Sequence, residues 1–369
     1  MAVSMLREIK AVAAHFVISG EFLVAERFGG GHINDSYLLT YQQDIRPVRY
    51  LLQRINDQVF KNASLLMDNI QRVTGHIART LKSQGARDAG RRVLTLMFTH
   101  EREPCCRDKA GSHWRLYRFI EGAHNHDVVE TAEHADRAGR AFGTFQRLLA
   151  DFPGPRLHET IPDFHNTPLR FEALERAVQA DPRRRAAAAG REIEFALDHR
   201  SLAGVLLDLQ RRDEIPERIV HNDAKISNVL LDRRTGEELC VVDLDTVMPG
   251  LALYDFGDMV RSMTCTCAED EINLSKVEVR MPLFEALAGG YLESAGAFLT
   301  RAERRHLVFA GKLITLEQGV RFLTDFLQGD MYYKTTRPTH NLDRCRTQFK
   351  LVESITRHEA RMNLCIERL

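Results

Sequence analysis

One short stretch of the chain places a carboxylate and an amide at a spacing that suits phosphoryl transfer. It runs from residue 221 to 228 and reads His-Asn-Asp-Ala-Lys-Ile-Ser-Asn. In a phosphoryl-transfer loop an Asp takes the proton of the attacking hydroxyl, and an Asn four intervening residues later turns its side-chain oxygen to Mg²⁺. Asp223 is therefore the predicted catalytic base and Asn228 a predicted metal ligand. Lys225 is placed to neutralise charge on the transferring phosphoryl group, and its alternative is a solvated loop lysine.

A carboxylate after the next predicted hairpin completes the expected metal site. Residues 229–232 and 239–242 are largely apolar runs on either side of a polar turn, which is typical of a β-hairpin. Asp243 follows the second run, and a strand end would hold it rigidly. We therefore expect Asp243 to be the main Mg²⁺ ligand and Asp245 to be an outer candidate. The alternative is that these acids only cap turns on an α/β surface.

The triplet Asp255-Phe256-Gly257 spells the metal-binding motif of protein kinases, but its position argues against that role. It lies far beyond Asn228 and follows a Pro-Gly break instead of a strand. We interpret Asp255 as a buried structural carboxylate at the start of a helix over 256–263. There it would accept backbone N–H bonds and brace the catalytic loop.

A run of glycines lies between two segments that are predicted to be strands. Its members are Gly29, Gly30 and Gly31. Without side chains, such a run lets the backbone approach phosphate oxygens and point N–H groups at them. The run by itself is equally typical of a hairpin turn, but with the downstream metal loop it predicts a nucleotide-binding loop. Beyond it, two side chains are expected to meet phosphate and two to pack inward, namely Asn34 with Ser36 and Ile33 with Tyr37.

The third predicted strand carries Gln53 and Arg54 where protein kinases have a lysine that grips the phosphates. Side chains alternate along a strand, so only one of the two faces the nucleotide, and the sequence does not decide which. Arg54 has the right charge, and Gln53 is the alternative. The matching acid on the following helix is equally open, with Asp68 as the candidate.

The elements expected around these residues form a small sheet followed by a mostly helical region. Apolar patterning predicts strands over 22–28, 37–41, 48–55, 92–98 and 113–120. A helical period predicts a helix over 63–81, a capping box of Thr300 with Glu303 predicts one to about residue 328, and a last helix is expected from Asn341 onward.

This pattern predicts an α+β fold with two lobes. The N-terminal lobe would cover residues 1–120 and hold the nucleotide-binding sheet. The C-terminal lobe would cover 121–369 and hold the catalytic loop. The hinge is expected near 119–122, where Phe119 and Glu121 are candidates for nucleotide contact.

Composition limits the classes of protein and partner that fit. The chain has 369 residues, 44% of them hydrophobic, and no formal net charge, which gives no general attraction to nucleic acid or to an anionic membrane. No apolar run approaches the roughly 20 residues that a membrane-spanning helix needs. The first 16 residues predict an amphipathic helix and lack a secretory apolar region. Seven cysteines without paired metal spacing favour reduced thiols in a cytoplasm over a zinc site.

The segment from His221 to Asp258 resembles the aminoglycoside phosphotransferase and choline kinase superfamily. The resemblance implies a protein-kinase-like two-lobe fold that phosphorylates hydroxyls of small molecules. Within the superfamily the chain is most similar to the bacterial N-acetylhexosamine 1-kinases. Five stretches carry that closer similarity: 29–37, 50–56, 59–62, 243–250 and 321–334.

The resemblance also implies residues that hold the acceptor. Asp223 would contact the anomeric hydroxyl of a sugar, Arg321 its ring hydroxyls or acetamide, and Tyr332 would stack or hydrogen bond. The alternative for Arg321 is a helix-surface ion pair with Asp325, and the alternative for Tyr332 is packing. Basic residues near the end of the chain favour a neutral polyol over a polycationic aminoglycoside; they are Arg321, Lys334, Arg337, Arg344 and Arg346. The segment 163–166, with its His, is a further source of polar groups, or else is simply solvated.

Together these observations predict a kinase that uses ATP and Mg²⁺ to make a sugar 1-phosphate from N-acetylglucosamine or N-acetylgalactosamine. Kinases for another small alcohol, such as choline, homoserine or a different sugar, stay open, as does a catalytically silent nucleotide-binding module. A cytoplasmic monomer or weak homodimer is expected, with a small-molecule sugar as substrate and with neither nucleic acid nor membrane as partner.

Overall fold

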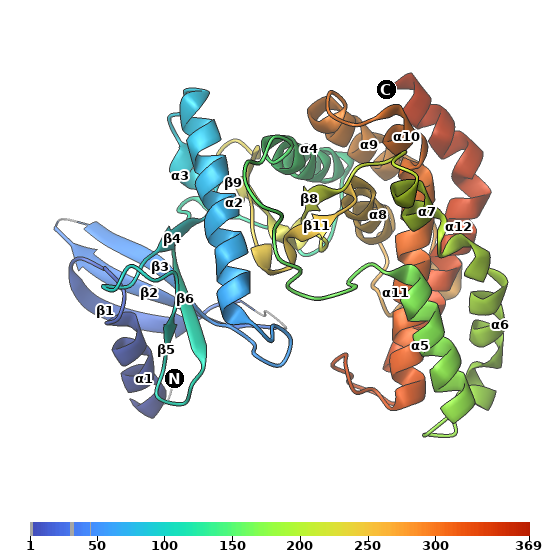
Figure 1. Cartoon of the computed structure of the whole chain (residues 1–369), viewed down its shortest axis with the longest axis horizontal. Coiled ribbons are helices and arrows are strands. Elements are labelled where there is room, and N and C mark those ends of the chain that lie inside the picture. Colours follow the sequence, from blue (N-terminus) through green and yellow to red (C-terminus); the bar gives the residue numbers. More distant parts are fainter. Residues whose placement is uncertain (1–2, 30–32, 45) are drawn as a thin grey trace. The chain divides into compact units, whose positions relative to one another are not determined.

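The computed structural model describes residues 3–29, 33–44 and 46–369, which form two compact units (Figure 1). The first unit is built on an antiparallel sheet and the second is mainly helical, which confirms the predicted fold class. The first unit holds the described residues up to His124, then Asp151–Pro162 and Leu230–Met248. The second holds Asn125–Ala150, Asp163–Val229 and Pro249–Leu369.

The main sheet of the first unit has six strands within the described residues, in the order β1-β2-β3-β6-β4, with β5 beside β6. All its pairings are antiparallel. The strands are β1 (Glu21–Arg27), β2 (Asp35–Gln43), β3 (Arg46–Arg54), β4 (Thr95–Met97), β5 (Cys106–Arg107) and β6 (His113–Arg118).

One face of this sheet packs against helix α1 (Val3–Ala13). Apolar residues of the helix, such as Ile9 and Val12, join Leu39, Leu52 and Leu116 of the sheet in one buried cluster. Burial of this face fixes the register, because a slip by one residue would turn every apolar side chain to the opposite side. The other face of the sheet is therefore the one that carries polar residues at its centre.

Two helices and a second, smaller sheet complete the first unit. They are α2 (Ala63–Ser83), α3 (Ala89–Arg92), and the strands β7 (Ala123–His124), β9 (Val229–Asp232) and β10 (Glu238–Val241), which pair in the order β10-β9-β7. The strand predicted over 92–98 is too long, because Arg92 belongs to α3 and β4 pairs with β6 only over Thr95–Met97. The single-turn helix η4 (Leu244–Thr246) follows β10.

The second unit consists mostly of helices. They are α4 (Ala132–Leu148), α5 (Thr167–Ala180), η1 (Ala186–Ala189), α6 (Gly190–Asp198), η2 (Arg200–Leu202), α7 (Val205–Arg211), η3 (Ile226–Asn228), α8 (Ala252–Met263), η5 (Leu274–Lys276), α9 (Met281–Ala295), α10 (Arg301–Arg305), α11 (Leu307–Gln328) and α12 (His340–Arg368). Two short strands, β8 (Arg218–Val220) and β11 (Met248–Gly250), flank the segments that carry the candidate site.

Glycines allow α4 and α9 to pack backbone against backbone. A Cβ on Gly139 would lie 2.3 Å from the carbonyl oxygen of Leu287, and one on Gly290 would lie 2.2 Å from that of Asp136. Neither distance is possible for a real side chain, so these two positions need glycine. The loop over residues 221–228 lies beside α4 and α8, so this close contact supports it.

The capping box of Thr300 and Glu303 is confirmed, but the long helix predicted from it is two helices. His306 separates α10 from α11 and has a non-helical backbone (φ −102°, ψ 7°). Its Nδ1 lies 2.7 Å from the carbonyl oxygen of Ala302, which satisfies a carbonyl at the end of α10. The site helix therefore begins only at Leu307.

No helix in the described part of the chain is long and apolar enough to cross a membrane. All seven cysteines are free thiols.

Candidate active site

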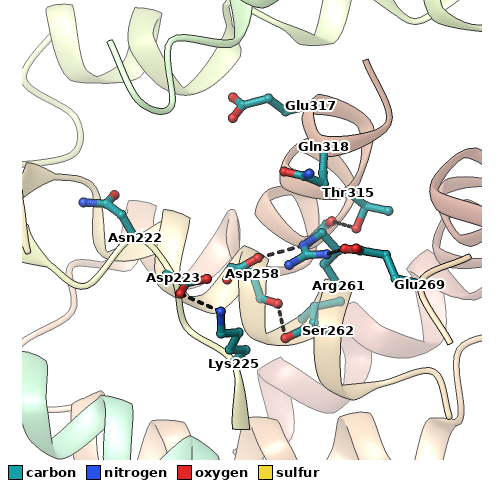
Figure 2. A network of polar contacts seen from close by, with 12 residues as sticks. Asn222, Asp223, Lys225, Asp258, Arg261, Ser262, Glu269, Thr315, Glu317 and Gln318 are labelled. Carbon is teal, nitrogen blue, oxygen red and sulfur yellow. Dashed lines mark hydrogen bonds and ion pairs between the residues drawn. The ribbon is translucent and has the colours of Figure 1, made fainter. Parts of the chain in front are cut away.

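The loop after β8 brings the predicted base and its two polar neighbours together. Lys225 Nζ lies 2.9 Å from Asp223 Oδ2, and Asn228 Nδ2 donates to the same oxygen at 3.0 Å. Asn228 also donates to the backbone carbonyl of Asp223 at 2.9 Å, so it closes the loop on itself. The carboxylate of Asp223 stays 30% exposed, which leaves it accessible to a hydroxyl group (Figure 2).

The surroundings of Asp223 keep its carboxylate ionised. Burial works to raise its pKa, but the charge and hydrogen bond of Lys225, the nearby His221 and the Asn228 amide outweigh it, and the pKa lies below the usual range. A carboxylate that is ionised at neutral pH can accept a proton from a hydroxyl as it attacks. The geometry and the charge state therefore both suit the role predicted for Asp223.

Asp255 braces this loop, as the sequence predicts. It is fully buried and accepts hydrogen bonds from the backbone N–H groups of His221, at 2.9 Å, and Asn222, at 2.7 Å. Gln146 of α4 donates to it at 2.7 Å. Two details of the prediction are wrong: α8 begins at Ala252, so Asp255 lies within its first turn, and the Pro-Gly segment before it belongs to the short strand β11. The helix starts earlier because Tyr254 N–H already bonds the carbonyl of Leu251.

His165 is part of a buried contact with the loop and is not a solvated residue. Its Nδ1 lies 2.8 Å from Glu317 Oε1, and its Nε2 lies 3.4 Å from the carbonyl oxygen of Asn222. Thr167 also donates to Glu317, at 2.6 Å. Glu317 is 1% exposed and was missed in the sequence, although its place one helical turn before Arg321 puts both on one face of α11.

A second polar group near the loop comes from α8. Arg261 Nε donates to Asp258 at 2.7 Å, and its Nη1 donates to Glu269 at 2.9 Å. Ser262 bonds the backbone of Asp258, and Figure 2 shows this group beside Asp223, Thr315 and Gln318. The sequence prediction missed Arg261, although Asp258 lies three residues before it and Glu269 eight residues after it.

Arg321 lies on α11 among aromatic side chains. Its guanidinium lies 5.2 Å from the ring centre of Phe164 and 6.0 Å from that of Tyr333, and Nη1 donates to Gln318 at 3.3 Å. The alternative pairing with Asp325 is wrong, because Asp325 accepts hydrogen bonds from other groups. They are the backbone N–H groups of Met331, Tyr332 and Tyr333 and the side chain of Asn341.

Tyr332, the predicted stacking residue, is 61% exposed, and its ring packs edge-on against Tyr333 at 4.8 Å. Tyr333 is the tyrosine that lies over Arg321, and its hydroxyl accepts from Gln318 at 3.1 Å. The sequence prediction therefore missed Tyr333. The orientation of the two adjacent tyrosines depends on the hydrogen bonds that Asp325 accepts from their backbone N–H groups, which the sequence does not reveal.

The two predicted metal ligands each offer a hard oxygen. The Asn228 amide nitrogen faces Asp223, which leaves the amide oxygen for a cation. Asp243 is exposed and precedes η4 as its N-cap residue, with a left-handed backbone (φ 61°). Within the described residues no group of three or more His, Cys, Asp or Glu side chains could hold a metal ion. Asn228 belongs to the second unit and Asp243 to the first, so their joint role as Mg²⁺ ligands stays a prediction.

Asp245, the outer metal candidate, is committed to other partners. It is 3% exposed, pairs with Arg115 of β6, and accepts from Asn34 Nδ2 at 2.7 Å. The side-chain oxygen of Asn34 also accepts from Asn56 N–H at 3.0 Å, and a contact of Asn34 with phosphate stays a prediction. Arg115 is a buried cation that sequence analysis missed, because nothing in a strand pattern distinguishes it from an exposed arginine.

The register of the sheet separates Gln53 from Arg54. Gln53 lies opposite Ser36 and Arg115, and it donates to Ser36 at 2.9 Å and accepts from Arg115 at 3.1 Å. Arg54 is on the opposite face, where it pairs with Asp35. Gln53 and Arg115 therefore lie on the polar face of the sheet, where Arg115 contacts Asp245 of η4. Arg54 lies on the opposite face, which α1 covers.

The glycine run lies mostly outside the described residues, which include neither Gly30 nor Gly31. Gly29 has a left-handed backbone (φ 69°), a conformation that favours glycine. Beyond the run, Tyr37 is buried as predicted, but Ile33 is 46% exposed, so its predicted inward packing is wrong.

Asp68 does not pair with either residue of the third strand. It faces Arg72 at 3.3 Å and His158 at 3.2 Å. The neighbouring Asn69 is fully buried and donates to the backbone carbonyls of His158, at 2.8 Å, and Val247, at 3.1 Å. At this position of α2 the buried polar side chain is therefore the neutral amide of Asn69, which holds the backbone at the end of η4.

Phe119 and Glu121, the two hinge candidates, both contact Arg49. The guanidinium of Arg49 lies 4.5 Å from the ring centre of Phe119 and forms an ion pair with Glu121. Phe28 packs edge-on against Phe119 at 5.6 Å, which links the residue before Gly29 to Phe119. An assignment of both residues to nucleotide contact stays a prediction.

Residues 24–289 of the chain match the phosphotransferase enzyme family. Among solved structures, the chain is similar to a microcompartment-associated aminopropanol kinase, with a TM-score of 0.57, 14% identity and coverage of 98% of this chain and 99% of that one. It is also similar to an aminoglycoside phosphotransferase from Alicyclobacillus acidocaldarius, with a TM-score of 0.57, 14% identity and coverage of 98% and 96%. A choline kinase from Cryptosporidium parvum gives a TM-score of 0.51, 12% identity and coverage of 98% of both chains. Since the family match covers well over half of the sequence, the chain belongs to the phosphotransferase enzyme family.

Proposed function

We propose that the chain is a small-molecule kinase that transfers the γ-phosphoryl group of ATP to the anomeric hydroxyl of an N-acetylhexosamine. The observation that carries the choice of a neutral acceptor is the pairing of the acids around the base. Asp223 faces Lys225, Asp258 and Glu269 share Arg261, and Glu317 faces His165.

This pairing disfavours a polycationic acceptor. An aminoglycoside would need carboxylates that are not already matched by cations of the protein, because each ammonium group must recover the solvation that it loses. Arg321, which lies near the same helix face, adds further positive charge. A neutral polyol needs only hydrogen-bond donors and acceptors, and the loop and α11 supply both.

In this proposal Asp223 orients the sugar hydroxyl and takes its proton as the oxygen attacks the γ-phosphorus. The bond from that phosphorus to the bridging oxygen breaks, and ADP leaves, so no covalent intermediate with the protein forms. Lys225 holds Asp223 in its ionised state and lies close enough to neutralise charge on the transferring group. Mg²⁺, when bound with the nucleotide, would neutralise phosphate charge, with Asn228 and Asp243 as the proposed ligands.

The acceptor contacts on the helical side follow from the surroundings of Arg321. Its guanidinium provides several donors in a fixed plane, and Phe164 and Tyr333 hold it in place. Such a fork suits an acetamide oxygen or two ring hydroxyls. Tyr332, next to Tyr333 and largely exposed, is the proposed stacking residue at the outer side of the sugar.

A substrate screen tests the proposal. ATP consumption would be measured with N-acetylhexosamines, other sugars, choline, ethanolamine, homoserine and aminoglycosides, and the phosphorylated position of any product would then be identified. An anomeric phosphate is acid-labile and leaves a non-reducing sugar. A phosphate on a primary hydroxyl or on choline would replace the hexosamine by another small alcohol, and the absence of turnover with all acceptors would favour a silent nucleotide-binding module.

A further inference from the structure

Two aspartates on one turn of the first unit have opposite surroundings. Asp243 is exposed and left-handed, with φ 61°, whereas Asp245 is 3% exposed. Asp is among the non-glycine residues that enter the left-handed region most readily, and contacts of the surrounding residues decide whether it is held there. The side chain of Asp243 can therefore act as a ligand only if something else fixes this turn.

Side chains of the main sheet fix the turn through the carboxylate of Asp245. Arg115 donates to both of its oxygens, with Nη2 at 3.0 Å, and Asn34 donates to Oδ2 at 2.7 Å. The side chains of the pair are 1% and 4% exposed. A two-pronged contact of this kind has a defined geometry, and burial protects it from screening by salt.

Backbone contacts hold the same turn from other segments of the first unit. Thr160 Oγ1 donates to the carbonyl oxygen of Asp245 at 2.9 Å, and Asn69 donates to that of Val247 at 3.1 Å. Asn34 lies just beyond the glycine run, so the carboxylate of Asp245 links the start of β2 to η4. Movement of either segment would disturb the other.

Arg115 also lies within electrostatic reach of Asp243. Burial works to lower the pKa of Arg115, but the negative charge of Asp245 and, more weakly, that of Asp243 raise it above its ordinary value. Three contacts direct the guanidinium elsewhere: two to Asp245 and one from Nε to Gln53 at 3.1 Å. The ion pair thus keeps a buried cation from turning toward Asp243.

We propose that Arg115 and Asn34 are positioning residues for Asp243 and act through Asp245, which is a brace and not itself a metal ligand. The inference rests on the proposed function, because it concerns how the chain binds a metal–nucleotide complex. Loss of the negative charge of Asp245 leaves the buried guanidinium of Arg115 without its carboxylate partner. The turn that carries Asp243 would lose its brace, and the unpaired positive charge would weaken Mg²⁺ binding there.

Equilibrium binding of a non-hydrolysable ATP analogue to the full chain, with Mg²⁺ and with EDTA, tests this role without any acceptor. The quantity of interest is the ratio of the two affinities. Asp245→Asn should reduce that ratio by about tenfold or more, the usual effect of losing a partner behind a metal ligand, while the affinity in EDTA changes little. The double variant Asp245→Asn with Arg115→Gln should recover part of the ratio, because the unpaired cation is gone.

Two further variants keep the test decisive. Asn34→Ala retains the ion pair of Asp245 with Arg115 and removes only the hydrogen bond from Asn34 to Asp245. This variant should fold even if Asp245→Asn does not, and it should lower the affinity ratio by a smaller factor. Asp232→Asn is the matched control, since Asp232 pairs with Arg91 at 2.8 Å in the same unit without contact to η4, and it should leave the ratio unchanged.

Several outcomes would overturn the inference. A wild-type ratio retained in Asp245→Asn or in Asn34→Ala would remove the positioning role, as would an equal loss of affinity with and without Mg²⁺. A double variant as impaired as the single one would overturn the part assigned to the unpaired guanidinium of Arg115. If the substrate screen finds no sugar that is phosphorylated, the binding ratios still test the positioning role. If the wild-type chain binds nucleotide with no dependence on Mg²⁺, both the proposed function and this inference are overturned.

Discussion

Two turns of this protein share a strained backbone, yet different forces hold them. In the second unit, Asn222 is left-handed (φ 63°) directly before the base, and Asp255 accepts its N–H bond. In the first unit, Asp243 is left-handed (φ 61°), and Asp245 two residues later is the buried acid. Each unit thus uses one buried aspartate to hold the turn that presents a functional side chain.

The partners of the two acids differ. Asp255 is satisfied by two backbone N–H groups and the amide of Gln146, and burial raises its pKa. Asp245 is satisfied by the guanidinium of Arg115. Hydrogen bonds from backbone N–H groups hold a loop largely independently of the charge of nearby groups. The strength of an ion pair, by contrast, changes when a charged group binds or leaves nearby. The loop that carries the predicted base is therefore braced by hydrogen bonds to its backbone, and the turn that carries the predicted metal ligand is braced by a charge pair.

The largest expected effect is on the base itself. Asp223→Asn should lower turnover by roughly a hundredfold or more, because the amide cannot take the proton, while binding of the ATP analogue stays near normal. Steady-state kinetics with the acceptor found in the screen, together with nucleotide binding, would measure both. Substantial turnover in the variant would remove Asp223 from the mechanism.

Replacement of Asp255 and of Asp243 by alanine, one acid from each turn, tests the comparison further. Asp255→Ala leaves the N–H groups of His221 and Asn222 unpaired and should destabilise the fold by about 1–3 kcal/mol for each group. Asp243→Ala should instead abolish Mg²⁺-dependent activity in a chain that melts like the wild type, since an exposed carboxylate contributes little to stability. Thermal unfolding and metal-dependent binding would be measured for both. A normal melting temperature for Asp255→Ala with lost metal affinity would reverse the assignment.

A smaller effect is expected at the acceptor side. Arg321→Ala should lower kcat/KM for the sugar by about 1.5–3 kcal/mol, the range for a hydrogen bond from a charged donor, and leave the ATP KM almost unchanged. Lys in place of Arg321 should rescue poorly, because it lacks the planar fork. If both KM values rise together, Arg321 acts on the fold and not on the acceptor.

The smallest effect concerns an acid outside both turns. Backbone N–H groups of Thr235 and Arg234, and then Arg91, lower the pKa of Asp232 from 3.8 to about 2. A carboxylate with a lowered pKa stabilises the folded state above the unfolded-state value, and this contribution is lost as the pH falls through the folded-state value. The melting temperature of Asp232→Asn should therefore lie below that of the wild type at neutral pH and approach it near pH 2. A difference that stays constant with pH would mean that the charge of Asp232 is not involved.

The sequence by itself determined what depends on neighbours in the chain. Asp223, Lys225 and Asn228 lie within six consecutive positions, so one loop conformation brings them together, and spacing alone indicated the group. The two-unit α+β architecture followed from the period of apolar residues, which reports the face of each strand or helix that must be buried. The bracing role of Asp255 was predicted correctly, although Asp255 lies within the first turn of α8 and not before a helix.

Only the tertiary structure decided the pairings between distant residues. Asp245 meets Arg115 from 130 positions away, and Glu317 meets His165 from 152 positions away. Strand register decided that Gln53, and not Arg54, shares a face with Arg115. Such contacts depend on which strands pair and in which register, and on how each helix is rotated against its neighbours. The local sequence does not determine either, because a strand or helix keeps the same backbone conformation whichever partner its side chains contact.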